Sequence, residues 1–168
     1  MKIVSRLVAL TGCALALSGC GFHPLYGTHA GDPGARQIFS SIYVDPIEHE
    51  RMGYELRNQL MDQLRGVEHP VEALYHLHVT VTETREGVAL QNDATVTRYD
   101  LAIRAKYEPT DKNMKSVYKG EESTLESFDV AQSPYASLSA QEDSERNAAS
   151  DIAQHITLDL SVHFAHDH

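Results

Sequence analysis

The sequence predicts an α+β fold, a two-layer sandwich in which two helices cover one face of a four-stranded, mostly antiparallel sheet. Three observations support this prediction. Several segments alternate apolar and polar residues with the two-residue period of half-buried strands. Two longer segments repeat apolar residues at helical spacing. The order along the chain is strand, helix, three strands and helix (β-α-β-β-β-α), and two amphipathic helices need the apolar face that such a sheet offers.

The first strand is expected within residues 38–44, because aromatic and β-branched residues there end at Asp45-Pro46, and proline cannot continue a strand ladder. An amphipathic helix follows over 49–65 and ends at Gly66. Its apolar residues recur every four positions and form one stripe that faces the core: Met52, Leu56, Leu60 and Leu64.

Three further strands, joined by short polar loops, form an antiparallel meander. The first covers 73–88 and the second covers 95–107. In the second, the residues of one face are Tyr99, Leu101, Ile103, Ala105 and Tyr107, and those of the other are Arg98, Asp100, Arg104 and Lys106. A turn over 109–113 leads to the last strand, which is expected from residues 116–120 and 124–130 with a bulge at Gly120.

A long amphipathic helix over 140–162 completes the fold. Acidic residues occupy the face opposite a stripe of small and branched apolar residues: Ala148, Ala149, Ile152, Ile156 and Leu160.

The N-terminus has the pattern of a secretory signal peptide. Two cations at Lys2 and Arg6 precede the apolar run Leu7–Leu17, which is too short to span a bilayer comfortably as an uncleaved anchor. Leu17-Ser18-Gly19-Cys20 looks like a bacterial lipobox, in which the chain is cut before Cys20 and this cysteine is acylated. Cleavage at the alternative, Cys13, leaves too short an apolar core for a signal.

This interpretation divides the chain into a cleaved signal peptide (1–19), a lipidated N-terminus and tether (20–37), one domain (38–165) and a histidine-containing tail (166–168). The mature chain carries 12 basic and 24 acidic residues, a formal charge of −12, which argues against nucleic acid as a partner. Cys13 leaves with the signal and Cys20 is acylated, so neither a disulfide nor a cysteine nucleophile is expected.

Three local patterns resemble one family. Cys20-Gly21-Phe22-His23-Pro24-Leu25-Tyr26-Gly27 is similar to the start of the mature LptE lipoproteins of alphaproteobacteria, which act in lipopolysaccharide assembly. Ser127-Phe128-Asp129-Val130 and Ser133-Pro134-Tyr135-Ala136 resemble the C-terminal half of that family. The resemblance implies a non-enzymatic outer-membrane lipoprotein that sits inside the β-barrel LptD, helps this barrel to assemble and takes part in delivering lipopolysaccharide to the cell surface.

The resemblance also implies binding of lipopolysaccharide through basic residues. Arg98, Arg104 and Lys106 lie on one face of a predicted strand, and Lys115 and Lys119 are expected near them. These five residues form a hypothetical contact for lipopolysaccharide phosphates. The alternative is an ordinary solvated sheet face, with Asp100 in its middle.

Other functions have weaker support in the sequence. His76 and His78 share one strand face, and His163, His166 and His168 lie near the C-terminus, so a lipoprotein that binds a divalent metal through surface histidines is the alternative function. The Gly-x-Ser-x-Gly, His-Glu-x-x-His and phosphate-binding glycine motifs of common enzymes are missing. We therefore expect no enzymatic activity and no cofactor.

Overall fold

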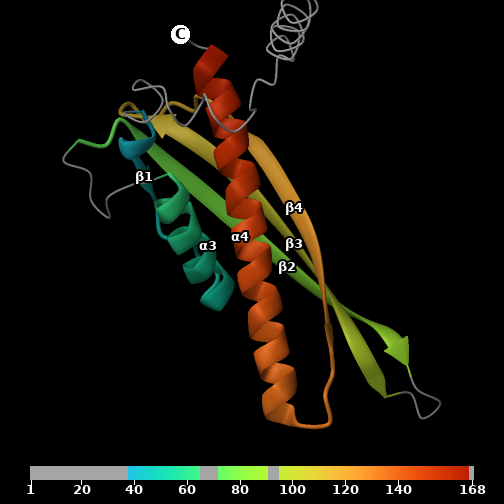
Figure 1. Cartoon of the computed structure of the whole chain (residues 1–168). Helices are drawn as coiled ribbons and strands as arrows, with labels where there is room; N and C mark the ends of the chain where they lie inside the picture. The colour runs from blue at the N-terminus through green and yellow to red at the C-terminus, as the bar shows by residue number, and fades with distance from the viewer. Residues whose placement is uncertain (1–37, 65–71, 91–94, 167–168) are drawn as a thin grey trace, which may run out of the picture. The chain divides into compact units, whose positions relative to one another are not determined.

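The computed structural model of the protein describes residues 38–64, 72–90 and 95–166. It contains an α+β domain in which the sheet has the strand order β1-β2-β3-β4. β1 runs parallel to β2, and the other two pairs are antiparallel. In chain order the elements are β1 (Ile42–Val44), α3 (Glu50–Gln63), β2 (Tyr75–Leu90), β3 (Val96–Asp111), β4 (Gly120–Asp129) and α4 (Pro134–His166). Both helices lie on one face of the sheet (Figure 1), so the predicted architecture is confirmed.

The core forms between the helices and the inward-facing side chains of the strands. The inward-facing residues of β2 and β3 alternate along each strand, as predicted: Leu77, Val79, Val81, Leu101, Ile103, Ala105 and Tyr107. α3 contributes Met52, Leu56 and Leu60, and α4 contributes the stripe from Ala148 to Phe164. Each of these side chains is almost entirely removed from water, and this burial is the main force that holds the layers together.

The first strand is shorter than the sequence predicts. Residues 38–40 are helical, and the strand starts only at Ile42. The reason is a tight turn at Ser41, whose backbone N–H and side-chain hydroxyl both donate to the carbonyl oxygen of Ile38, at 3.0 Å and 2.6 Å. A serine hydroxyl that bonds the nearby backbone competes with strand formation, so the prediction for 38–41 was wrong.

β3 extends through the predicted turn to Asp111, with Pro109 buried inside it. The carbonyl oxygen of Pro109 accepts the N–H of Val117, which lies on the β4 side of β3. The backbone nitrogen and carbonyl of one strand residue point the same way, so the nitrogen of Pro109 also faces the β4 side. β4 has not yet begun there, because its first residue, Gly120, is paired with Tyr107. The missing N–H of proline therefore breaks no ladder bond.

The last two elements also differ in their limits. β4 starts at Gly120 in regular register, whereas Ser116 makes only an isolated bridge to Thr110, so the expected strand 116–120 and its bulge are not found. The register shifts lie instead between β2 and β3, beside Gly87 and Ala89. α4 begins at Pro134, because proline suits the first turn of a helix and Ser133 accepts the N–H of Ser137 at 3.1 Å.

Several predictions fall outside the described residues: the signal peptide, Cys20 and the tether, the helix stop at Gly66, and the last residues of the tail. No helix within the described part of the chain is long and apolar enough to cross a membrane.

Candidate functional site

The sheet face turned away from the helices is the candidate site. It consists of the residues of β2, β3 and β4 that alternate with the core residues, and no described element covers it. We call it the open face. Its charged side chains include His76, His78, Glu86, Arg98, Asp100, Arg104, Lys106, Glu108, Glu121 and Asp129, and its threonines include Thr80, Thr82, Thr84 and Thr110.

The five predicted basic residues fall in three places. Arg104 and Lys106 lie on β3, and Lys106 and Lys119 line the same shallow hollow of the open face; we call Arg104, Lys106 and Lys119 the basic cluster. Arg98 lies six residues from Arg104 along β3, which is roughly 20 Å at the rise of a strand. Lys115 is an exposed residue of the β3–β4 connection.

The cations of the basic cluster have carboxylate neighbours. Arg104 pairs with Glu121, which lies 3.8 Å from the Lys106 ammonium, and Lys119 lies 3.2 Å from Glu108. Hydrogen bonds from the Ser116 and Lys119 side chains lower the pKa of Glu108. The basic cluster is therefore part of a mixed-charge surface.

Arg98 is paired in the same way at the other end of β3. It donates to Asp129 at 2.8 Å, and this bond raises the pKa of Arg98 and lowers that of Asp129. Asp100, between Arg98 and the basic cluster, accepts a hydrogen bond from Ser127 at 2.6 Å. The solvated, mixed-charge character that the sequence offered as the alternative is thus present along the whole of β3.

Two shallow hollows follow the open face. The larger, of about 550 Å³, is lined by Lys106 and Lys119 with Glu108, Glu121, His78 and Thr80. The smaller, of about 370 Å³, lies further along the strands and is lined by Thr82, Thr84, Ala102 and Leu125 together with Arg104. Arg104 therefore borders a patch of threonine methyls and apolar side chains.

This arrangement suits reversible binding of an anion that carries apolar groups. Surface ion pairs contribute little to stability, because both ions remain hydrated and their side chains lose entropy when they pair. A phosphate with several oxygens can therefore replace Glu121 or Glu108 as the partner of Arg104, Lys106 or Lys119.

The carboxylates were not part of the predicted site. Glu108 lies two residues after Lys106 on the same strand, so the alternation of side chains alone places it on the open face. Glu121 required the strand register, because it meets Lys106 only through the pairing of β3 with β4.

The histidines lie in separate surroundings. His76 Nδ1 is 3.1 Å and His78 Nδ1 is 4.0 Å from the Asp45 carboxylate, whereas His163 stacks on Tyr118 with 4.6 Å between ring centroids. In the described ranges, no three His, Cys, Asp or Glu side chains are grouped so that they could hold a metal ion.

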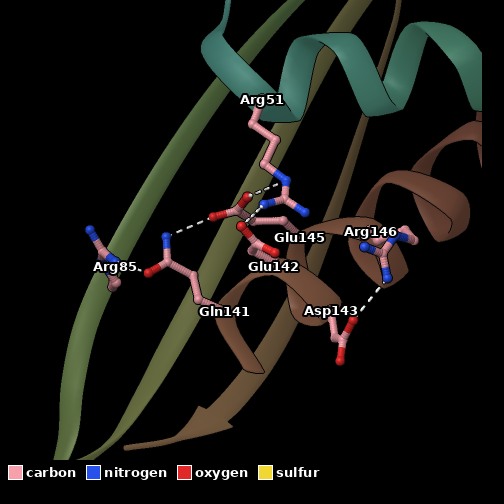
Figure 2. Close-up of polar contacts among 7 residues, drawn as sticks. All are labelled: Arg51, Arg85, Gln141, Glu142, Asp143, Glu145 and Arg146. Atoms are coloured by element: carbon pink, nitrogen blue, oxygen red, sulfur yellow. Dashed lines mark hydrogen bonds and ion pairs between the residues drawn. The ribbon is translucent and has the colours of Figure 1, made fainter. Parts of the chain in front are cut away.

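A second polar group joins the helices to the sheet, away from the open face (Figure 2). Arg85 of β2 donates to Gln141 of α4 at 2.7 Å, and Gln141 donates to Glu145 at 2.7 Å. Arg51 of α3 pairs with Glu142 and lies 3.7 Å from Glu145. These bonds connect three elements, and the Glu145 side chain at their centre is only 8% exposed.

Comparison with known proteins identifies the family. The sequence model described as "LptE: Lipopolysaccharide-assembly" matches residues 39–160, most of the chain and nearly all of the described domain. The chain belongs to the LptE family. It is thus a lipoprotein of a non-enzymatic family that acts in lipopolysaccharide assembly.

Solved structures of other bacterial lipoproteins are similar to this chain. A protein from Caulobacter crescentus CB15, described as a lipoprotein, is 34% identical, with a TM-score of 0.69 and coverage of 80% of this chain and 98% of that chain. A minor lipoprotein from Acinetobacter baumannii is 16% identical, with a TM-score of 0.56 and coverage of 74% and 94%. The rare lipoprotein B from Shewanella oneidensis is 11% identical, with a TM-score of 0.56 and coverage of 76% and 98%.

The last two proteins share the fold with this LptE-family chain. A search of curated protein sequences found no match.

Proposed function

We propose that this LptE-family lipoprotein sits inside the lumen of the outer-membrane β-barrel LptD, helps this barrel to assemble and takes part in moving lipopolysaccharide to the cell surface. The observation that carries the proposal is the family match over residues 39–160. Participation in lipopolysaccharide assembly belongs to the family, and the barrel partnership is the specific form proposed for this chain.

The open face supports this placement. The lumen of a large outer-membrane barrel is polar and filled with water, so a protein inside it needs a hydrated surface. The open face carries many threonines and charged side chains, and each of these can bond to polar groups of a lumen wall or to water.

Acylation of Cys20 supplies the attachment in this proposal. A cysteine that carries several acyl chains holds a protein at a membrane almost permanently, whereas one chain gives only reversible binding. The domain then needs no spanning segment of its own to stay beside its barrel.

The basic cluster is the proposed contact for lipopolysaccharide phosphates. Lys106 and Lys119 line the larger hollow and Arg104 lines the smaller one, and their carboxylate partners are partly exposed and exchangeable. Arg98 and Lys115 lie apart from the cluster and form secondary positions in this proposal.

The decisive experiment is a mild-detergent pull-down of the tagged, full-length protein from its native outer membrane, followed by mass spectrometry. We expect one large β-barrel protein in a stoichiometric amount. Recovery of the lipoprotein without a barrel, under conditions that keep the membrane complexes intact, would reject the partnership.

The control is Cys20→Ser, which removes the acylated atom and leaves the domain unchanged. We expect this variant to lose palmitate labelling and to leave the membrane fraction. Unchanged palmitate labelling in Cys20→Ser would show that another residue carries the lipid.

A further inference from the structure

The connection between β3 and β4 begins with a tightly bonded loop, residues 112–115, which we call the tip loop. The Asp111 carboxylate accepts the backbone N–H groups of Asn113 at 2.8 Å and Lys115 at 2.9 Å. The backbone N–H of Met114 donates to the Asp111 carbonyl oxygen at 2.9 Å, and that of Asp111 donates to the Lys115 carbonyl oxygen at 2.9 Å. These bonds hold the loop in one conformation.

Met114 is held in an unfavourable backbone state at the end of this loop. Its φ of 61° is the only positive value at a non-glycine residue in the described ranges. The left-handed region costs free energy for residues with a Cβ, and glycine or asparagine is the usual choice there. The side chain is nevertheless apolar and 78% exposed, so the loop presents it to the surroundings.

The neighbours of Met114 combine apolar and cationic groups. Lys112 and Lys115 flank it and are exposed, and Leu74, which precedes the partner of Asp111 in β2, is 38% exposed. The acidic groups here are Glu72, which pairs with Lys112, and Asp111, whose carboxylate turns into the loop. The bond from the Lys115 backbone N–H lowers the pKa of Asp111. The exposed Lys115 ammonium can therefore turn outward beside Met114, and that of Lys112 can do so when it exchanges Glu72 for another anion, because exposed ion pairs are weak.

The tip loop lies at the end of the sheet where the described chain begins. Ile42 pairs with Tyr75, and Tyr75 pairs with Asp111, so these residues form one row across three strands. Adjacent strands are about 4.8 Å apart, which puts the start of β1 roughly 10 Å from the base of the tip loop. Figure 1 shows β1 and the β3–β4 connection at the same end of the sheet. The first described residue, 38, is only four positions before β1 in the sequence.

We propose that the tip loop is a second, non-covalent membrane contact, in which Met114 enters the headgroup region of a phospholipid surface and Lys112 and Lys115 bind lipid phosphates. An apolar side chain flanked by lysines matches the layered chemistry of that region, because long lysine stems lie along apolar surface while their ammonium groups stay at the phosphates. Together, the acyl anchor and the tip loop orient the domain on the membrane. The contact needs the acyl anchor of the proposed function but does not need the barrel.

The chain itself provides a clean test, because it contains no tryptophan. Met114→Trp introduces a single fluorophore at the tip loop. The acylated full-length variant is placed in vesicles of phosphatidylethanolamine and phosphatidylglycerol, without barrel protein, and its emission and quenching by brominated lipids are recorded. Leu125→Trp is the matched control, since Leu125 is 63% exposed but lies on the open face.

We expect a blue shift and strong quenching at position 114, with neither effect at position 125. Lys112→Glu combined with Lys115→Glu removes the phosphate contacts, so most of the shift at position 114 is lost. Water-like emission at 114 in these vesicles overturns the proposal. Equal quenching at positions 114 and 125 also overturns it, because the open face would then lie on the membrane. A blue shift that requires added barrel protein or lipopolysaccharide overturns it as well.

A second variant tests whether the large indole side chain itself changes the conformation of the tip loop. In the mature acylated chain, Met114→Cys introduces the only free thiol. Of the two cysteines in the sequence, Cys13 is removed with the predicted signal peptide and Cys20 carries the acyl group. We expect its labelling by a charged maleimide to slow severalfold when the protein is bound to vesicles. An unchanged labelling rate rejects the contact independently of the fluorescence result. Because no barrel is present, these outcomes do not depend on the pull-down.

Discussion

At the scale of single residues, Gly120 shows how one position fixes a buried polar contact. It pairs with Tyr107 across β3 and β4, and a Cβ at position 120 would overlap the Tyr107 ring. The missing side chain leaves room for the Tyr107 hydroxyl to donate to Asp159 of α4. Tyr118 also bonds to Asp159 and lies 6.2 Å from Tyr107 between ring centroids. This glycine therefore helps to dock α4 on the sheet.

We predict that Gly120→Ala destabilises the domain by about 1–3 kcal/mol, the usual cost of overpacking a filled core. The Tyr107 ring must move, and its hydroxyl then loses the Asp159 carboxylate. Denaturant unfolding measures the effect. Gly87→Ala is the control, because Gly87 is exposed and its new methyl group comes no closer than 3.0 Å to the Val96 side chain and 3.6 Å to the Tyr99 ring. Equal losses in the two variants would contradict this role of Gly120.

A pH dependence follows from the same contact. Burial, and then the hydrogen bond to Asp159, raises the pKa of Tyr107 far above its ordinary value. In the unfolded chain a tyrosine loses its proton near pH 10, whereas the folded protein keeps it. Ionisation of Tyr107 therefore does not change the free energy of unfolding below about pH 10. Above about pH 10 it lowers the free energy of unfolding by up to about 1.4 kcal/mol per pH unit. Tyr107→Phe should show a shallower alkaline decline in unfolding experiments; parallel curves would refute the assignment.

At the scale of elements, α4 packs on the core through small side chains and is joined to α3 by the polar group around Glu145. The alanines Ala148, Ala149 and Ala153 are fully buried, and small side chains let packed elements approach closely. Glu145 binds Arg51 of α3 and Gln141, and Gln141 connects to β2 through Arg85. Figure 2 shows that these side chains converge from three elements.

We predict that Glu145→Ala destabilises the domain by about 1 kcal/mol, because Arg51 and Gln141 each lose a nearly buried partner, although Arg51 keeps Glu142 and Gln141 keeps Arg85. Asp143→Ala is the matched control from the same helix. Its carboxylate is 67% exposed and bonds only to Arg146 in the group drawn in Figure 2, so the melting temperature should barely change. Thermal unfolding compares the two, and a larger loss in Asp143→Ala would show that burial does not set the effect.

At the scale of the whole molecule, the fold gives its two sheet faces different tasks. One face is closed by α3 and α4 and provides the stability, while the open face keeps its charges in solvent. A binding surface on rigid strands can change its side-chain partners without repacking the core. The basic cluster is therefore open to mutation with little structural risk.

We predict that Arg104→Glu combined with Lys106→Glu weakens binding of lipopolysaccharide to the purified protein about tenfold or more. Charge-assisted hydrogen bonds contribute about 1.5–3 kcal/mol each, and 1.4 kcal/mol corresponds to a factor of ten. Arg98→Glu is the control on the same strand, outside the cluster, and should have a smaller effect. Equal affinity in the double variant and the original protein, with both still folded, would leave the cluster as ordinary solvated surface.

The sequence alone determined the order of the elements, the side of each strand that faces the core, the predicted acylation at Cys20 and the family resemblance, because these depend on local periodicity and short motifs. Tertiary structure decided what depends on partners distant in the sequence. Pro109 is accommodated only because β4 starts late, and Glu121 meets Lys106 only through the register of β3 with β4. The tip loop likewise comes near the start of β1 only through pairing across three strands. Local patterns carry no information about register, and register is what builds the surfaces of this protein.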